Sequence, residues 1–334
     1  MKNRIINLLS ITSLGRLILF SFSKTFTQEF KESLQAKKLF HRNKNIKSNI
    51  FLLRRNLHRL EKGLCSPKRK DFFAKEYIES TVFNFIGLYS DKLFTDKYEN
   101  DLLYAHQILS KYFSVVTQTE QIVKLKKLFE KATSNHNALT NSLVPYKFKK
   151  LSEIELISYY QFESLIKRRR SIRYYENKKV LNSDIEKAVK HAKFSPSPCN
   201  RYSVRYHCIS NKKLIKQVGS IVGGAKSFID NVPKLIAITS LSSAYEGLYD
   251  RHATYIDASL SLMTLVYSLE TLGLNSCVIN WPKIPINDFK ARELLNLDPS
   301  ENVIMLLSVG YADLNGMVPF SQKVSNKTLI KYYD

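Results

Sequence analysis

The fold of this 334-residue chain is signalled most strongly by the stretch Ile166-Lys-Arg-Arg-Arg-Ser-Ile-Arg-Tyr174. Four of its side chains, Arg169, Arg170, Ser171 and Arg173, are suited to holding a phosphate dianion. Guanidinium forks bind phosphate through charge-assisted bonds that are roughly twice as strong as neutral ones, and a neighbouring hydroxyl adds a donor. Taken alone, such a charge run is more often a solvated basic face than a phosphate site.

Three further stretches follow along the chain. Phe194-Ser-Pro-Ser-Pro-Cys-Asn200 predicts a rigid loop after a helix, in which the Asn200 amide can both donate and accept. The segment from Asp257 to Cys277 combines a long apolar helix, ending near Gly273, with a tight turn and a strand. Leu307-Ser-Val-Gly-Tyr311 predicts a strand that breaks at its glycine. Each stretch alone is compatible with an ordinary turn or with core packing.

Together, the four stretches resemble the nitroreductase family of FMN-dependent oxidoreductases. That family is marked by an Arg-Arg-Ser-Ile-Arg-like opening, a Ser-Pro-Ser loop ending in Asn, a helix closing in Gly-Leu-Gly-Ser-Cys, and a final Gly-Tyr-Pro. The resemblance covers residues 160–325 and implies an α+β fold, with a mixed, mostly antiparallel sheet flanked by helices. It also implies that hydride passes from NADH or NADPH through FMN to a small acceptor, in a ping-pong cycle.

The resemblance further implies which residues hold the FMN. The phosphate and ribityl chain would contact the Arg/Ser stretch and a basic residue after the Gly-Tyr turn, and the ring would lie beside the start of a strand. In the family, the Ser-Pro-Ser loop reaches the flavin of the other subunit, so the site implies a homodimer. The expected cofactor-binding residues are Arg169, Arg170, Ser171, Arg173, Pro196, Ser197, Asn200, Ser276, Cys277 and Lys323.

The chemistry would belong to the flavin rather than to a dedicated catalytic side chain. Reduced flavin is anionic at N1 near neutral pH, so a nearby cation such as Arg173 or Lys178 would stabilise it. Cys277 is expected to line the site rather than to act as a nucleophile.

Three positions depart from the family pattern. The usual Asn-x-Gln-Pro is replaced by Asn200-Arg-Tyr-Ser203, Gly-Leu-Gly by Gly273-Leu-Asn275, and the last Pro by Ala312. Asn275 is expected in the left-handed backbone region, which asparagine tolerates better than most residues. The departures leave two alternatives open: an inactive flavin fold that serves as a scaffold or binding protein, and a specialised reaction such as reductive dehalogenation or flavin fragmentation.

Hydrophobic patterning predicts the elements around these stretches. Ser183 and Glu186 have the spacing of a capping box and predict that a helix opens over residues 184–193. A buried helix is predicted over residues 255–272. Strands are predicted at residues 204–209, 235–239, 277–279 and 303–309. No Gly-rich turn follows a strand, which argues against a Rossmann fingerprint and a P-loop.

The first part of the chain has a different pattern. Apolar residues recur at three- and four-residue spacing from about residue 30 to 140, which predicts helices. Turn residues and Pro145 predict a linker between about 135 and 155. We therefore divide the chain into a basic, mainly helical extension, residues 1–150, and an FMN-binding domain, residues 151–334.

Within the extension, Leu53-Arg-Arg-Asn-Leu-His-Arg-Leu-Glu-Lys-Gly63 resembles the front segment of longer nitroreductase-like proteins found among bacterial cell-surface polysaccharide genes. His58 and Glu61 lie one helical turn apart, a spacing that is more typical of an ordinary surface pair than of an acid/base pair.

The charge is strongly asymmetric. The net charge is +23, and residues 1–80 hold 18 basic against 6 acidic side chains. This excess suggests an anionic partner such as a membrane surface or an acidic protein, with a solvated surface as an equal alternative. An amphipathic segment over residues 5–18 would make a membrane contact, although a disordered or packed terminus is the commoner case. Nucleic acid is disfavoured because no zinc finger, RRM signature or helix-turn-helix pattern accompanies the charge.

The four cysteines form no CxxC pair and no His pair has metal spacing, so neither a metal site nor a disulfide framework is expected. The N-terminus lacks a signal-peptide cleavage site and an apolar run long enough to span a bilayer. These features favour the cytoplasm, with a peripheral position on the inner face of the membrane as a further option.

Overall fold

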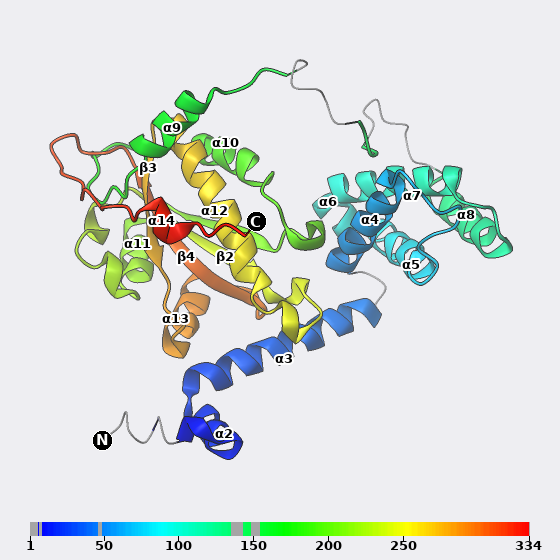
Figure 1. Ribbon diagram of the computed structural model, residues 1–334, viewed down its shortest axis with the longest axis horizontal. Helices are drawn as coiled ribbons and strands as arrows, with labels where there is room; N and C mark the ends of the chain where they lie inside the picture. The colour runs from blue at the N-terminus through cyan, green and yellow to red at the C-terminus, as the bar shows by residue number, and fades with distance from the viewer. Residues whose placement is uncertain (1–5, 7–8, 46–48, 135–142, 148–153, 334) are drawn as a thin grey trace.

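A four-stranded antiparallel sheet forms the centre of the second half of the chain. The computed structural model describes residues 6, 9–45, 49–134, 143–147 and 154–333 (Figure 1). The strands are β1 (Val204–Ile209), β2 (Lys234–Leu241), β3 (Asn275–Asn280) and β4 (Glu301–Gly310). Their order is β1-β2-β4-β3, and each neighbouring pair is antiparallel. The predicted strands and the α+β class are confirmed; β1 has the predicted bounds and the other three are longer.

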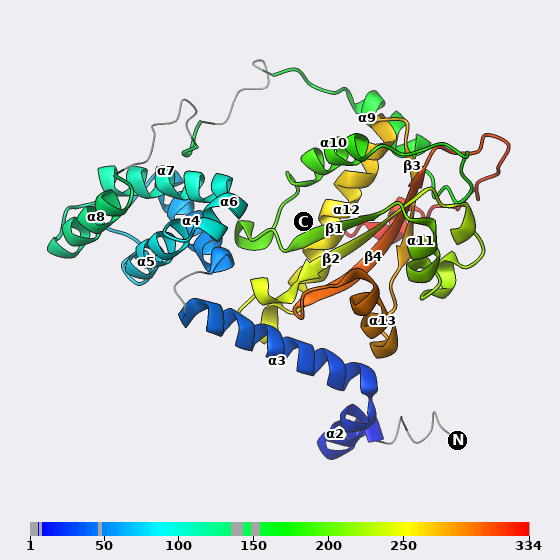
Figure 2. The same cartoon turned by 180° about the vertical axis from the view of Figure 1, so that it is seen from behind.

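Helices cover both faces of this sheet (Figures 1 and 2). They are α9 (Tyr159–Arg168), α10 (Asn182–Ala192), α11 (Lys212–Gly219), α12 (Ala253–Thr271), α13 (Pro285–Leu295) and the short α14 (Asn326–Leu329). Because successive side chains of a strand point to opposite faces, Ile236 and Ile238 of β2 pack with α10 and α12, whereas Leu235 and Ala237 pack with α11 and α13. This explains why β2 is an unbroken apolar run.

The N-terminal part is all-helical, as predicted. Its helices are α2 (Ser13–Phe22), α3 (Lys24–Asn45), α4 (Ile50–Cys65), α5 (Ile78–Tyr89), α6 (Lys92–Lys97), α7 (Glu99–Val115) and α8 (Glu120–Ala132). Fully buried side chains such as Leu53, Phe85 and Leu109 pack α4, α5 and α7 together. The same apolar cluster includes Tyr245 and Ala253, so the helical bundle shares part of its core with the segment before α12. None of the described helices is both long and apolar enough to cross a bilayer.

The predicted linker lies mostly outside the described residues, which omit 135–142 and 148–153. His58 and Glu61 form the expected pair within α4, with 3.5 Å between Nδ1 and Oε2. Their side chains are half-buried rather than fully exposed.

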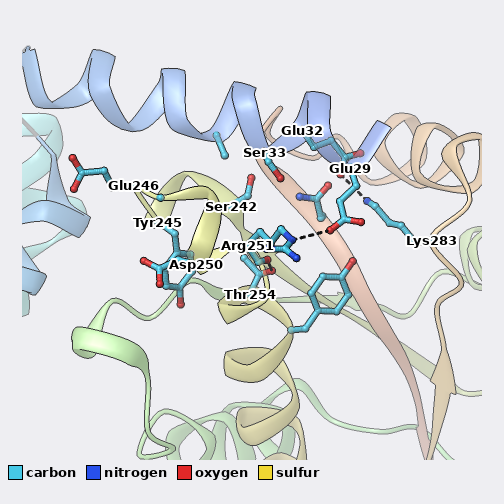
Figure 3. A pocket seen from close by; sticks show the side chains of 14 residues that line it. Glu29, Glu32, Ser33, Ser242, Tyr245, Glu246, Asp250, Arg251, Thr254 and Lys283 are labelled. Atoms are coloured by element: carbon cyan, nitrogen blue, oxygen red, sulfur yellow. Dashed lines mark hydrogen bonds and ion pairs between the residues drawn. The ribbon is translucent and has the colours of Figure 1, made fainter. Parts of the chain in front are cut away.

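Helix α3 is held against the second half of the chain by ion pairs (Figure 3). Glu29 lies 3.6 Å from the Arg251 guanidinium, and Glu32 lies 2.9 Å from the Lys283 ammonium. The same Lys283 also contacts Asp288 of α13 at 2.9 Å. The charged pocket between these groups has a volume of only about 50 Å³. This is room for about one or two water molecules and not for a cofactor.

The predicted capping box at Ser183 is wrong. Helix α10 begins at Asn182, two residues before the predicted start at Asp184, and its N-cap residue Leu181 makes no side-chain cap bond. The buried ammonium of Lys234 donates to the Asn182 side chain at 2.6 Å, so a tertiary contact with β2 accompanies this helix start. A capping box does occur at Ser158, where α9 begins.

The left-handed conformation predicted for Asn275 is also wrong. Gly273 makes the turn after α12, with φ +74°, and Asn275 already belongs to β3. The Asn275 side chain instead accepts a hydrogen bond from the Ala312 backbone N–H at 3.0 Å and donates to Glu270 at 3.2 Å. One glycine therefore suffices for the turn, and the asparagine ties β3 to the segment after β4.

Candidate functional site

The Arg/Ser stretch runs beside β3. Arg169 is the C-cap residue of α9, and Ser171 forms a parallel bridge with Ser276. The Ile172 N–H donates to the Ser276 carbonyl at 3.0 Å. The structure therefore brings together the Arg/Ser stretch and the Ser276-Cys277 pair, which are about a hundred residues apart in the sequence.

Tyr175 anchors the far end of this stretch. Its buried hydroxyl lies 2.6 Å from the Ile172 carbonyl oxygen and 2.7 Å from the Ser308 hydroxyl of β4. Burial raises the pKa of Tyr175 well above its ordinary value, so the phenol stays neutral. A Cβ atom added to Gly310 would lie only 2.6 Å from the Tyr175 ring, which is the physical reason for the glycine in the last predicted strand.

Arg169, Arg170 and Arg173 are partly buried, and among the described residues none of their guanidinium groups forms an ion pair with a carboxylate. Their neighbour Arg168, by contrast, is neutralised by the buried Glu270 of α12 at 3.0 Å. Unpaired positive charge is thus concentrated at the start of β3. Such an arrangement is suited to an anionic ligand.

Cys277 lies in the same neighbourhood and is buried. Burial raises the pKa of its thiol, although the nearby Arg173, Ser171 and Arg169 oppose that rise. A buried, protonated thiol is a poor nucleophile, which agrees with the expected role of Cys277 as part of the wall.

The Ser-Pro loop is organised by a buried carboxylate that the sequence did not single out. Asp257 of α12 is 2% exposed, and its Oδ2 accepts from the hydroxyls of Ser197 at 2.9 Å, Ser203 at 3.0 Å and Tyr245 at 2.6 Å. Burial raises the pKa of Asp257, while these hydrogen bonds act in the opposite direction. The only sequence signal for this role was a carboxylate inside an apolar helix.

The backbone of the loop is unusual. Cys199, Asn200 and Tyr202 have φ values of 54°, 56° and 50°, a left-handed conformation that is uncommon for residues other than glycine. Pro196 and Ser197 border a cavity of about 410 Å³ between α10, β1 and α12. The loop is therefore held in one defined shape next to a cavity of ligand size.

The two predicted parts of the site are separated within one chain. Asp257, which holds the Ser-Pro loop, and Glu270, which contacts Arg168, are 13 residues apart on α12. At 1.5 Å per residue this is about 20 Å along the helix. Figure 1 shows α9 beside one end of α12, consistent with this separation. Pro196, Ser197 and Asn200 are therefore not brought to the Arg/Ser stretch of the same chain.

Lys323 lies in the exposed segment after β4. In the part of the chain that the structure describes, its ammonium group makes no ion pair, and only its backbone carbonyl is bonded, by Gln322 at 3.0 Å. The described residues contain no group of three or more His, Cys, Asp or Glu side chains placed to hold a metal ion.

Part of this chain is similar in sequence to known proteins. Residues 166–225 and 217–311 match the nitroreductase family. An iodotyrosine deiodinase of Hydra vulgaris is 24% identical over 250 residues, which covers 64% of this chain and 90% of that protein.

Solved structures of related proteins are similar as well. An FMN-dependent nitroreductase from Clostridium difficile is 22% identical and covers 51% of this chain and 98% of its own, with a TM-score of 0.44. A putative nitroreductase from Bacillus subtilis is 17% identical and covers 53% of this chain and 100% of its own, with a TM-score of 0.46.

Proposed function

We propose that the protein is an FMN-dependent oxidoreductase that transfers hydride from NADH or NADPH to a small acceptor, because residues 166–311 match the nitroreductase family. The observation that carries the proposal is the group of three guanidinium groups beside β3, Arg169, Arg170 and Arg173, which have no carboxylate partner among the described residues. A phosphate dianion is the ligand that such a group fits best.

The chain's own residues would bind and orient the cofactor. Arg169, Arg170, Ser171 and Arg173 would hold the phosphate and ribityl chain, with Lys323 added if the C-terminal segment folds back. Ser276 and the neutral thiol of Cys277 would line the space for the ring. Bound FMN would supply the redox chemistry by accepting hydride at N5 and passing it on.

Positive charge would also be held near the ring. Arg173 is the better placed of the two cations expected there, because it lies near Cys277. The Lys178 ammonium lies over the Tyr311 ring, 3.9 Å from its centre, and would contribute from farther along the same segment.

We further propose that the working form is a homodimer. The separation of about 20 Å along α12 supports this, because Pro196, Ser197 and Asn200 can complete a flavin site only on a second copy. In such a dimer each subunit supplies the guanidinium groups of one site and the Ser-Pro loop of the other.

Visible absorption of the purified protein tests the redox function. We expect the spectrum of bound flavin, released as FMN on denaturation, and bleaching when NADH or NADPH is added without oxygen. Bound FMN that either nucleotide fails to bleach would rule out the nicotinamide donors. Absence of flavin after FMN is supplied would favour the alternative function, a catalytically weak scaffold or binding protein.

The same experiment can identify the chemical class of the hydride acceptor. The relative from Hydra vulgaris is a deiodinase, so reductive dehalogenation is the second candidate reaction. The reduced protein should be mixed with a nitroaromatic compound and with an iodinated phenol in parallel. Faster reoxidation by the iodinated phenol, with iodide release, would assign the chain to dehalogenation.

A link to cell-surface polysaccharide synthesis and a cytoplasmic position, peripheral on the inner face of the membrane, remain part of this proposal. Support for the membrane position comes from α2, where Leu14, Leu17 and Phe22 are exposed and no acidic residue occurs. Ile5 and Leu8 of the predicted amphipathic segment lie outside the described residues. We expect the protein to sediment with anionic vesicles and not with neutral ones. Equal recovery in both supernatants would exclude the membrane contact.

A further inference from the structure

The helical bundle reaches the Ser-Pro loop directly. Arg54 of α4 donates from Nη1 to the backbone carbonyl of Arg201 at 2.9 Å. Its guanidinium also lies 5.8 Å from the centre of the Tyr202 ring. Tyr202 stands where the family pattern has Gln, and Arg201 fills the variable position directly before it. The altered part of the loop is thus the part that the extension contacts.

Arg54 is itself held firmly by the extension. Its Nε and Nη2 donate to the two carboxylate oxygens of Asp101 on α7, each at 2.7 Å. The two side chains are 13% and 24% exposed, so this bidentate pair is shielded from much of the solvent. Bidentate geometry fixes the plane of the guanidinium. The pair with Asp101 therefore points Nη1 of Arg54 toward the loop, independently of the bond to the Arg201 carbonyl.

The loop needs such support on that side. The Arg201 side chain is 4% exposed; its guanidinium lies 4.9 Å from the Tyr245 ring centre and 3.7 Å from Asp250. Tyr202, with φ 50°, follows immediately, and its N–H donates to the Ser197 hydroxyl at 3.1 Å. Left-handed residues with side chains persist only where several contacts define them together. Asp257 supplies those contacts from α12, and Arg54 supplies them from the helical bundle.

We infer that the Arg54–Asp101 pair is a positioning device for the Ser-Pro loop, so that the N-terminal extension is a working part of the loop rather than an independent module. The effect on the loop follows from the contacts alone. Its consequence for the flavin rests on the proposed function, because the loop would complete the site of a second copy.

Cys199 provides a readout that needs neither flavin nor turnover. It lies in the loop and is partly exposed, and its rate of alkylation in the purified protein can be measured by peptide mapping. In Arg54→Gln the Arg201 carbonyl loses its hydrogen-bond donor. We expect Cys199 to react about tenfold faster, because a segment with fewer supports opens more often. Asp101→Asn keeps Arg54 but weakens its anchor, and should produce a smaller rise in the same direction.

Arg59→Gln is the matched control. Arg59 lies on the same helix α4, but its guanidinium lies over the Tyr77 ring of the extension, 3.7 Å from its centre. This variant should leave the Cys199 rate within about twofold of wild type. Unchanged Cys199 reactivity in both Arg54→Gln and Asp101→Asn would overturn the inference. If Arg54→Gln does not fold, Asp101→Asn alone decides.

The FMN dissociation constant of the same variants distinguishes the positioning role of the Arg54–Asp101 pair from the proposed part of the loop in the flavin site. Faster Cys199 alkylation together with weaker FMN binding supports both the positioning role and the composite site. Faster alkylation with unchanged FMN binding supports the positioning role and counts against the proposed part of the loop in the flavin site.

Discussion

An Arg169→Ala, Arg173→Ala double variant is expected to bind FMN about 1000-fold more weakly than the wild-type protein. Hydrogen bonds to charged groups contribute about 1.5–3 kcal/mol each, so loss of two guanidinium groups should cost about 4 kcal/mol of binding free energy. Neither group forms an ion pair with a carboxylate among the described residues, so the fold should lose little. The measurement is the dissociation constant of FMN for flavin-stripped protein, followed by fluorescence quenching.

Lys167→Ala is the control for that experiment. Lys167 lies in the same basic stretch, but it is 68% exposed and pairs with Glu163 of its own helix at 2.9 Å. FMN binding should be nearly unchanged in this variant. A dissociation constant for the double variant within tenfold of wild type would mean that the phosphate is held elsewhere in the chain.

Asp257→Ala is expected to lower the free energy of unfolding by about 3 kcal/mol, because it leaves buried hydroxyl donors without their acceptor. Those donors are Ser197, Ser203 and Tyr245. Urea unfolding without added FMN measures the change, because a bound ligand would itself add stability. The control is Asp230→Ala, whose side chain is 69% exposed and pairs with an exposed Lys216, and which should change little. Equal stability of the two variants would show that Asp257 is not the centre of the loop network.

The difference in stability between wild type and Asp257→Asn should depend on pH, because only the wild type has the buried carboxyl group. The pKa of Asp257 is raised in the folded protein, so its contribution to stability is fully present below its unfolded pKa and is lost as the pH rises through the folded pKa. Asparagine does not titrate. The free energy of unfolding of wild type, relative to that of this variant, should therefore increase as the pH falls from the folded to the unfolded pKa of Asp257.

Much of the fold could be predicted from local pattern. The strand 204–209 and the long helix ending before Gly273 were recognisable because alternation and three- to four-residue spacing are properties of neighbouring residues. The predictions that were wrong concern single backbone positions. Ser183 does not cap its helix, which begins two residues earlier than predicted, at Asn182, where Lys234 makes a contact. Asn275 is a strand residue because Gly273 alone makes the turn.

The candidate site was predictable only in part. The Arg/Ser stretch and Ser276 were named from sequence, and the structure places them side by side through the Ser171–Ser276 bridge. Asp257 was not named as an organiser of the loop, because a carboxylate within an apolar helix does not reveal which hydroxyl groups it will meet. The roles of all these residues toward FMN remain predictions.

The sequence by itself determined most of the helices and strands, the family-like stretches and the excess of positive charge. All three depend on residues that are close together in the chain. Only the tertiary structure decided that Glu270 neutralises Arg168, whereas Arg169, Arg170 and Arg173 form no ion pair among the described residues. It alone also showed that Arg54, held by Asp101, supports a loop 147 residues away. The physical reason is that such contacts depend on how helices and strands distant in the chain pack together, and no local periodicity records that packing.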